Sequence, residues 1–203
     1  MNQNTKRRAL LLVVSAPSGA GKTTLCNRLL AGNPGMTRSV TCTTRAPRGM
    51  EKDGSEYHFL STDEFDRRVT EGLFLEHAVV HGNQYGTLRS AVEEALAVGK
   101  DVLLVIDVQG AASVRQAARS QGGLLGRAYV DIFIVPPSLN ALRDRLEKRG
   151  EDAPDVIERR LVNACQEMER GQEFQYRVVN DDLESAYSEL QAIVQAEHQR
   201  QSC

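Results

Sequence analysis

A glycine-rich turn between an apolar run and a helical segment constrains the fold of this chain more than any other feature. The apolar run spans residues 9–15, the helical pattern spans residues 23–30, and the turn contains Ser18-Gly19-Ala20-Gly21-Lys22-Thr23-Thr24. Glycines let the backbone fold closely around an anion, so that its N–H groups point at phosphate oxygens. Lys22 adds a positive charge toward the β- and γ-phosphates, and Thr23 offers its hydroxyl to Mg²⁺. The turn therefore predicts a nucleotide-phosphate site at the end of a buried strand.

The match to the phosphate-loop pattern has one departure. The pattern G-x-x-x-x-G-K-[ST] has Gly at the position held here by Ala16. The departure is mild, because Ala is the smallest residue with a Cβ. An ordinary glycine-rich turn with a surface lysine is the alternative interpretation.

Apolar runs of strand length alternate with helical patterns along most of the chain. The runs cover residues 9–15, 101–106, 129–135 and 176–179, and the helical patterns cover residues 23–30, 109–119, 139–149 and 156–170. This alternation predicts an α/β fold with a parallel sheet flanked by helices. Residues 38–81 break the rhythm with Thr, Arg, Gly and aromatic residues, and with a helix start at Ser61-Thr62-Asp63-Glu64. We expect an inserted lobe of short antiparallel strands around that helix.

Composition and charge exclude several classes of protein. The 203 residues carry 25 Lys+Arg against 27 Asp+Glu, a formal net charge of −2, which argues against holding nucleic acid by bulk charge. No stretch approaches the roughly 20 apolar residues that cross a bilayer, so no membrane partner is expected. The four cysteines are scattered without a CxxC pair, which favours a reducing, cytoplasmic location. Nothing in the composition favours one oligomeric state.

Asp107 follows a predicted central strand, at the carboxyl end where ligands bind in open α/β sheets. It begins Asp107-Val108-Gln109-Gly110, which could be a D-x-x-G element that senses a γ-phosphate, although no Asn-Lys dipeptide is present for a GTPase guanine box. GTPase, ATPase motor and nucleotide kinase all stay open at this point. Asp107 could also simply cap the next helix.

The expected inserted lobe contains a candidate second anion site. The stretch Thr41-Cys42-Thr43-Thr44-Arg45-Ala46-Pro47-Arg48 holds two arginines and a row of hydroxyls, with no acid among them. Planar guanidinium groups suit a dianionic phosphate, and Pro47 stiffens the segment that presents them. A solvated basic loop is the alternative for this stretch taken alone.

Several blocks together resemble the guanylate kinase family, in order from about residue 12 to residue 190. The blocks are Ser-Ala-Pro-Ser-Gly-Ala-Gly-Lys-Thr at 15–23, Thr-Thr-Arg-x-Pro-Arg at 43–48, Gly54-x-x-Tyr57-x-Phe59, Glu76-His77-Ala78, Gly82-Asn83-x-Tyr85-Gly86-Thr87, Ile106-Asp107-Val108-Gln109-Gly110 and Pro136-Pro137-Ser138. The resemblance implies a single domain with a P-loop NTPase three-layer sandwich. Its core would cover about 1–37, 97–142 and 169–203, its GMP-binding α+β lobe about 38–96, and its helical lid about 143–168.

The same resemblance implies transfer of the γ-phosphoryl group of ATP to GMP, with Mg²⁺, to give ADP and GDP in purine nucleotide metabolism. Guanine presents adjacent N1–H and N2–H donors, and Glu76 matches the position of a carboxylate that accepts both. Seven further residues match family positions that read the base, hold the acceptor phosphate or lie near the metal. They are Thr41, Arg45, Arg48, Tyr57, Tyr85, Thr87 and Asp107. We expect dGMP to be accepted as well, since no residue is placed to reject a missing 2′-hydroxyl.

The charge-dense stretch 143–160 matches the mobile lid of the family. Arg149 and Arg160 match arginines that reach over the transferring phosphoryl group and neutralise its equatorial oxygens. Asn180 and Asp181 match the loop that borders the donor adenine. No general base is needed, because the attacking phosphate oxygen is already anionic near neutral pH. The residues expected to act by positioning and charge neutralisation are Lys22, Arg48, Arg149 and Arg160.

Two alternatives stay open beside this resemblance. One is a guanylate-kinase-like module that binds partner peptides after losing catalysis, and the intact phosphate loop argues against it. The other is a kinase for a different nucleoside monophosphate, and Glu76 with its two threonines argues against that. Two positions depart from the family. Val105 stands where many members carry an acidic residue, which leaves Asp107 to carry more of any metal or base contact, and Gln84 stands where an aromatic or aliphatic residue is frequent.

Overall fold

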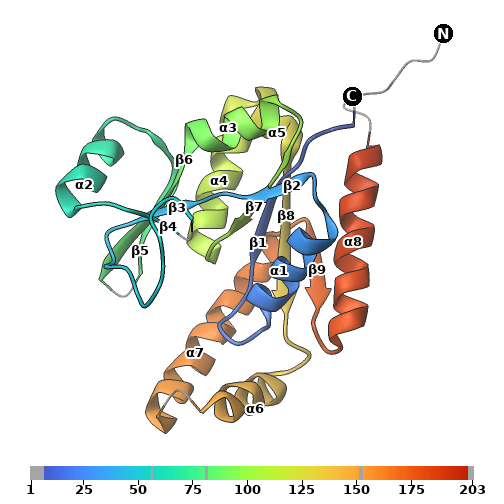
Figure 1. Ribbon diagram of the computed structural model, residues 1–203. Helices are drawn as coiled ribbons and strands as arrows, with labels where there is room; N and C mark the ends of the chain where they lie inside the picture. The colour runs from blue at the N-terminus through green and yellow to red at the C-terminus, as the bar shows by residue number, and fades with distance from the viewer. Residues whose placement is uncertain (1–6, 56, 81, 151–152, 201–203) are drawn as a thin grey trace.

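A five-stranded parallel sheet forms the centre of the computed structural model, which describes residues 7–55, 57–80, 82–150 and 153–200 (Figure 1). The strand order is β2-β7-β1-β8-β9. The strands are β1 (Leu11–Ser15), β2 (Met36–Arg38), β7 (Asp101–Val105), β8 (Tyr129–Val135) and β9 (Tyr176–Val179). Because β1 lies in the middle, the loop that follows it emerges at the centre of the sheet edge.

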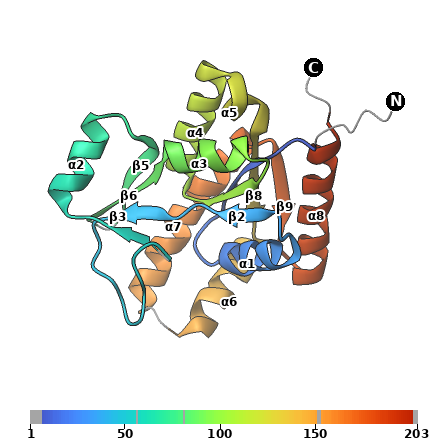
Figure 2. The same ribbon diagram turned by 45° about the horizontal axis from the view of Figure 1, so that its top comes forward.

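Helices cover both faces of this sheet, which gives the three layers that the sequence predicts (Figure 2). One face carries α1 (Lys22–Gly32) and α8 (Leu183–Gln199), and the other carries α3 (Arg89–Ala97), α4 (Val108–Gln121) and α5 (Gly123–Ala128). Successive strand residues point to opposite faces, so Leu12 of β1 packs toward α1 while Leu11 packs toward α4. Burial on both faces explains why the strands are almost continuously apolar.

A second, four-stranded sheet projects from one side of the core (Figure 1). Its order is β4 (Tyr57–Phe59), β3 (Thr41–Thr43), β6 (Asn83–Leu88) and β5 (Phe74–Val80), and helix α2 (Thr62–Thr70) packs on it through Phe65. Ser61 caps α2 as predicted, since its side chain accepts from the Glu64 N–H at 3.2 Å. The expectation of antiparallel strands holds for β3–β6–β5 and is wrong for β3 and β4, which are parallel because the connection between them returns to the end of the sheet where β3 begins.

Two helices extend beyond the carboxyl ends of the central strands (Figure 1). They are α6 (Leu139–Arg149) and α7 (Pro154–Arg170), and a 3₁₀ turn, η1 (Gly171–Glu173), follows α7. They pack on each other through a small apolar cluster made of Leu142, Leu146, Ile157, Leu161 and Ala164. Within the described ranges, no helix has the length and apolar character needed to cross a membrane.

Candidate functional site

The loop between β1 and α1 needs glycine at Gly21 for two separate reasons. Gly21 caps α1 with φ of 88°, in the left-handed region that residues with a Cβ rarely adopt. A Cβ there would also lie 2.2 Å from Nδ2 of Asn180, closer than any real contact. The Ala20 N–H donates to the Pro17 carbonyl at 3.1 Å, which closes the turn. The loop backbone is therefore held in the curved form that presents N–H groups to an anion.

The loop after β9 is fastened to this turn and to the lid helix α6. Nδ2 of Asn180 donates to the Ala20 carbonyl at 2.8 Å. Nη2 of Arg145 donates to the backbone carbonyls of Asn180 at 2.8 Å and Asp181 at 3.4 Å. Arg145 is thus a bridge between α6 and the segment matched to the donor adenine, and it is not among the predicted site residues.

A cavity of about 440 Å³ opens over the phosphate loop. Its lining comes from the loop, the end of β7 and the two lid helices, and consists of Ala16, Pro17, Ser18, Gly19, Gly21, Lys22, Thr23, Thr24, Asp107, Arg145, Leu146, Arg149 and Glu167. Nζ of Lys22 donates to the Ile106 carbonyl at 3.3 Å. Burial lowers the pKa of Lys22, while the nearby carboxylates of Glu167 and Asp107 oppose that effect. A buried ammonium group with little water around it is strongly stabilised when it pairs with a phosphate.

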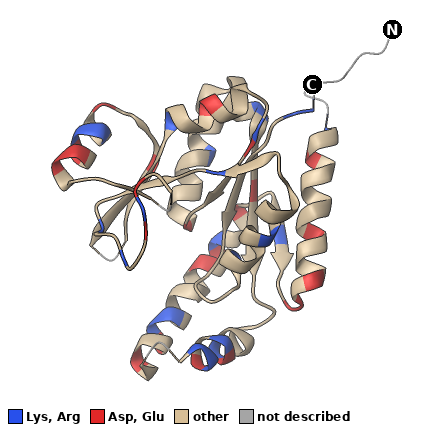
Figure 3. Ribbon diagram, in the orientation of Figure 1, with Lys and Arg blue, Asp and Glu red and all other residues tan. Residues whose placement is uncertain are grey.

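The lid helices bring their arginines to the same cavity. Arg149 lines it directly, and Nη1 of Arg160 donates to Oγ of Ser18 at 3.3 Å. Most other charges of α6 and α7 are interleaved on solvent-facing surfaces, where Arg159 pairs with Asp155 at 3.3 Å (Figure 3). Two residues matched to the reacting phosphoryl group therefore face the phosphate loop, while their neighbours form ordinary surface ion pairs.

The lobe presents a second basic group built around Arg45. Its Nη2 contacts both carboxylate oxygens of Glu51, at 3.0 and 2.9 Å, and its guanidinium lies 5.1 Å from the ring centre of Tyr57. The ring of Tyr85 meets that of Tyr57 edge-on at 6.2 Å. Arg48 is exposed, and its backbone N–H donates to Glu51 at 2.8 Å. Glu51, three residues beyond the acid-free stretch, is therefore an unpredicted residue that holds the Arg45 guanidinium group and the Arg48 backbone.

A buried carboxylate, Glu76 on β5, faces the junction between the lobe and the core. It is 6% exposed and accepts a hydrogen bond from Oγ1 of Thr87 at 2.6 Å. Burial raises its pKa to about 7, the Thr87 hydrogen bond opposes this, and the Asp107 charge adds to it. A Cβ on Gly110 would lie 2.9 Å from Oε2 of Glu76, so a larger residue there would displace this carboxylate.

Asp107 connects this junction to the phosphate cavity. Its Oδ1 accepts from the Gly110 N–H at 2.7 Å and caps α4, which is the structural role considered for it from the sequence. It also lines the cavity over the phosphate loop. The two interpretations of Asp107 are therefore compatible, because a carboxylate that caps a helix with one oxygen keeps the other for a ligand.

Comparison with known proteins agrees with this geometry. The guanylate kinase family model matches residues 7–197. The chain belongs to the guanylate kinase family. It is 47% identical to the guanylate kinase of Symbiobacterium thermophilum over 195 residues, covering 96% of this chain and 89% of that one. It is 50% identical to that of Alkalilimnicola ehrlichii over 190 residues, covering 94% and 90%. The crystal structure of guanylate kinase from Anaplasma phagocytophilum matches with a TM-score of 0.74 and 35% identity, covering 96% and 89%.

The positions matched to guanylate kinase functional residues fall into two spatial groups. The phosphate-cavity group contains Ser18, Gly19, Ala20, Gly21, Lys22, Thr23, Thr24, Asp107, Arg149, Arg160, Asn180 and Asp181. The lobe group contains Thr41, Arg45, Arg48, Tyr57, Glu76, Tyr85 and Thr87, with Thr41 paired to Tyr57 between β3 and β4. Arg145 precedes Arg149 by four residues and so lies on the same face of α6, but this spacing does not reveal its contact with the backbone of Asn180.

Proposed function

We propose that this chain transfers the γ-phosphoryl group of ATP to GMP and releases ADP and GDP. The proposal rests on the proximity of Asp107 and Glu76 at the end of β7. There Asp107 lines the phosphate cavity and accepts from the Gly110 N–H, while Glu76 lies against the same glycine. A guanine-reading carboxylate and a phosphate-binding loop at one sheet edge suit a phosphoryl transfer between two nucleotides.

On the donor side, the phosphate loop and the loop after β9 would hold ATP. Backbone N–H groups of the loop and the Lys22 ammonium group face the cavity where the phosphates bind. Mg²⁺ would be held by the Thr23 hydroxyl and by phosphate oxygens, with Asp107 lining the same cavity, which suits a cation that takes few protein ligands. The metal would neutralise negative charge on the phosphates during transfer.

On the acceptor side, Glu76 would accept N1–H and N2–H of guanine, with Thr87 fixing one of its oxygens. Adenine lacks this pair of donors, so a site that leaves Glu76 unpaired disfavours AMP. Arg45 and Arg48 would pair with the acceptor phosphate, and Tyr57 packs against Arg45. The same groups serve dGMP, because none of these contacts uses the 2′-hydroxyl.

Transfer itself needs positioning and charge neutralisation. Arg149 and Arg160 would reach the transferring group from the lid, since one lines the cavity and the other already contacts Ser18. Closure of α6 and α7 over the phosphate loop would exclude the water that otherwise hydrolyses ATP. We also propose a cytoplasmic location, which the free thiols of Cys26, Cys42 and Cys165 support.

A coupled ADP-release assay with ATP and GMP, AMP, UMP or dTMP in parallel tests the substrate. We expect turnover with GMP far above the other three acceptors. Lys22→Ala should lower kcat by about 10²-fold or more without unfolding the protein, as removal of one transition-state donor does. Lys100→Ala, at an exposed lysine outside the site, is the matched control. A peptide-binding module would show no turnover with any acceptor, and near-normal activity of Lys22→Ala would overturn the assignment of the loop.

A further inference from the structure

A second and larger cavity lies at the opposite edge of the central sheet from the phosphate loop. Its volume is about 1140 Å³, and it opens between the segment before β1, the end of α8, the turn after α3, and α5. The 17 residues of α8 run from the loop after β9 to this cavity, which separates the two sites by about 25 Å. None of the steps proposed for phosphoryl transfer uses it. We propose that this cavity binds a small molecule carrying a chain of phosphate groups, either inorganic or attached to a nucleoside.

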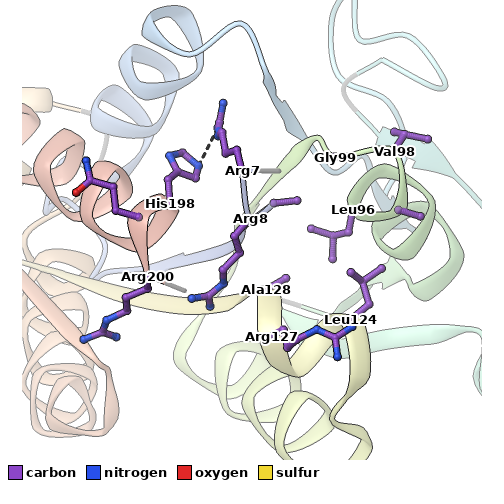
Figure 4. A pocket seen from close by; sticks show the side chains of 13 residues that line it. Arg7, Arg8, Leu96, Val98, Gly99, Leu124, Arg127, Ala128, His198 and Arg200 are labelled. Atoms are coloured by element: carbon purple, nitrogen blue, oxygen red, sulfur yellow. Dashed lines mark hydrogen bonds between the residues drawn. The ribbon is translucent and has the colours of Figure 1, made fainter. Parts of the chain in front are cut away.

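Cationic side chains define one side of this cavity. Figure 4 shows Arg7, Arg8 and Arg200 along that side, with His198 between them and Arg127 at one end. Arginines from three separate segments therefore line one hollow. Several guanidinium groups around a concave surface suit a multiply charged phosphate compound, because each guanidinium group can donate two N–H bonds to a phosphate.

The protein's own carboxylates neutralise only part of this charge. Buried Glu197 is shared, since it accepts from Nη1 of Arg8 at 3.3 Å and from Nη1 of Arg200 at 2.9 Å. Buried Asp101 pairs with Arg7. Arg127 has no carboxylate partner among the residues that the structure describes. Four guanidinium groups thus face two carboxylates, which leaves an excess of positive charge at the cavity.

Arg8 shows a further unmet requirement. Its Nε is shielded from solvent and has no hydrogen-bond partner within the described part of the chain. Buried donors are almost always paired, because an unpaired one has lost its hydrogen bonds to water without replacement. Arg8 lines the cavity, so a small rotation of its guanidinium toward a phosphate oxygen there would satisfy this donor. A ligand that accepts from Arg8 would therefore relieve a cost present in the free protein.

The opposite side of the cavity is apolar. Val98 is 73% exposed and Leu124 is 37% exposed. Both lie on the same side of the hollow as Leu96, across from Arg8 and Arg200, and Arg127 lies beside Leu124 (Figure 4). An apolar wall facing a cationic wall suits a ligand that joins a ring system to a phosphate chain. A nucleoside polyphosphate can contact both walls, whereas inorganic polyphosphate contacts the cationic wall alone.

Titration calorimetry on protein whose active site is already filled tests the proposal. A bisubstrate analogue, in which adenosine and guanosine are joined 5′-to-5′ through five phosphates, occupies the active site first. Inorganic tripolyphosphate and CTP are then titrated separately. We expect one further molecule to bind per chain, and the double change Arg127→Gln with Arg200→Gln to weaken it by about 10-fold or more. Both arginines are exposed, so the fold and kcat should be unchanged.

Arg177→Gln, at an exposed arginine on β9 outside this cavity, is the matched control and should bind both probes like the unaltered protein. Tighter binding of CTP than of tripolyphosphate, lost in Leu124→Ser, would identify a nucleoside polyphosphate as the ligand. Equal affinity would identify the phosphate chain alone. No binding of either probe, or equal weakening in Arg177→Gln, would overturn the proposal, and neither result bears on transfer between ATP and GMP.

Discussion

The change Glu76→Gln should stabilise the protein at alkaline pH while it damages GMP binding. Glu76 is 6% exposed, and its pKa is raised to about 7 from an ordinary value of 4.5, chiefly by burial. The folded chain therefore keeps a proton that the unfolded chain releases as the pH rises from about 4.5 to about 7. Stability is lost across that interval, and above pH 7 the fold contains a buried, ionised carboxylate.

The size of the effect follows from the two pKa values. At about 1.36 kcal/mol for each pH unit, the difference between 4.5 and about 7 corresponds to about 3 kcal/mol of unfolding free energy. Glutamine has nearly the same shape, can still accept from the Thr87 hydroxyl and carries no charge at any pH. We expect Glu76→Gln to raise the unfolding free energy at pH 8 by 1 to about 3 kcal/mol and to change it little at pH 4.

Urea unfolding at pH 4 and pH 8 measures this difference. Glu94→Gln, at an exposed glutamate on α3, is the matched control and should show no such pH dependence. In the same variant, the KM for GMP should rise by about 10-fold or more, because an amide offers guanine one acceptor in place of a carboxylate. An equal stability difference at both pH values would refute the reasoning, since it would mean that ionised Glu76 costs the fold nothing.

Two further changes test the geometry around the phosphate loop. Gly21→Ala and Gly72→Ala both place a Cβ at positive φ, which costs about 1–2 kcal/mol, but only the first puts that Cβ against Asn180. Thermal unfolding should show a larger loss for Gly21→Ala, with a raised KM for ATP, and equal losses would contradict the close contact. Arg145→Ala should raise the KM for ATP several-fold more than the KM for GMP, because Arg145 holds the backbone of Asn180. Arg159→Ala, on the exposed face of α7, should leave steady-state kinetics unchanged.

The parts of the fold set by local chemistry were the predictable ones. Strand β8 and helix α6 coincide with the predicted residues 129–135 and 139–149. The strand is buried throughout, so its apolar run stands out, and Ser138 marks the helix start by accepting from the Ala141 N–H at 3.0 Å. The glycine-rich phosphate loop was equally predictable, because Gly19 and Gly21 adopt a positive φ that other residues rarely adopt.

Elements that depend on long-range contacts were not predictable in this way. Strand β2 has three residues and exists through pairing with β7, more than sixty residues later in the chain. Helices α3, α5 and α8 were not among the predicted elements. Each is stabilised by burying one face against neighbouring helices or strands, and sequence spacing does not reveal those neighbours. The parallel pairing of β3 with β4 likewise depends on the path of the connection between them, which the strand residues do not specify.

The same limit applied to the site. Glu51 and Arg145 act through partners that the fold brings to them, respectively Arg45 and the backbone carbonyl of Asn180. Motif spacing predicts which groups would touch nucleotides, because their chemistry depends on residue type. It could not identify the residues that hold those groups in place, because a supporting contact can come from any segment that the fold places nearby.

The end of β7 shows why one position can serve the fold and the chemistry at once. Val105 is the last residue of β7 and pairs with Val14 in the central sheet. The first carboxylate after the strand is therefore that of Asp107, two residues later. One oxygen of Asp107 accepts the hydrogen bond that caps α4, and the negative charge of Asp107 helps to raise the pKa of Glu76 on β5. A guanine base that donates two hydrogen bonds would favour ionised Glu76 and so offset that repulsion. Binding of the acceptor base would thus relieve an electrostatic cost between the lobe and the core, and this would couple recognition of guanine to the proposed site of phosphate transfer.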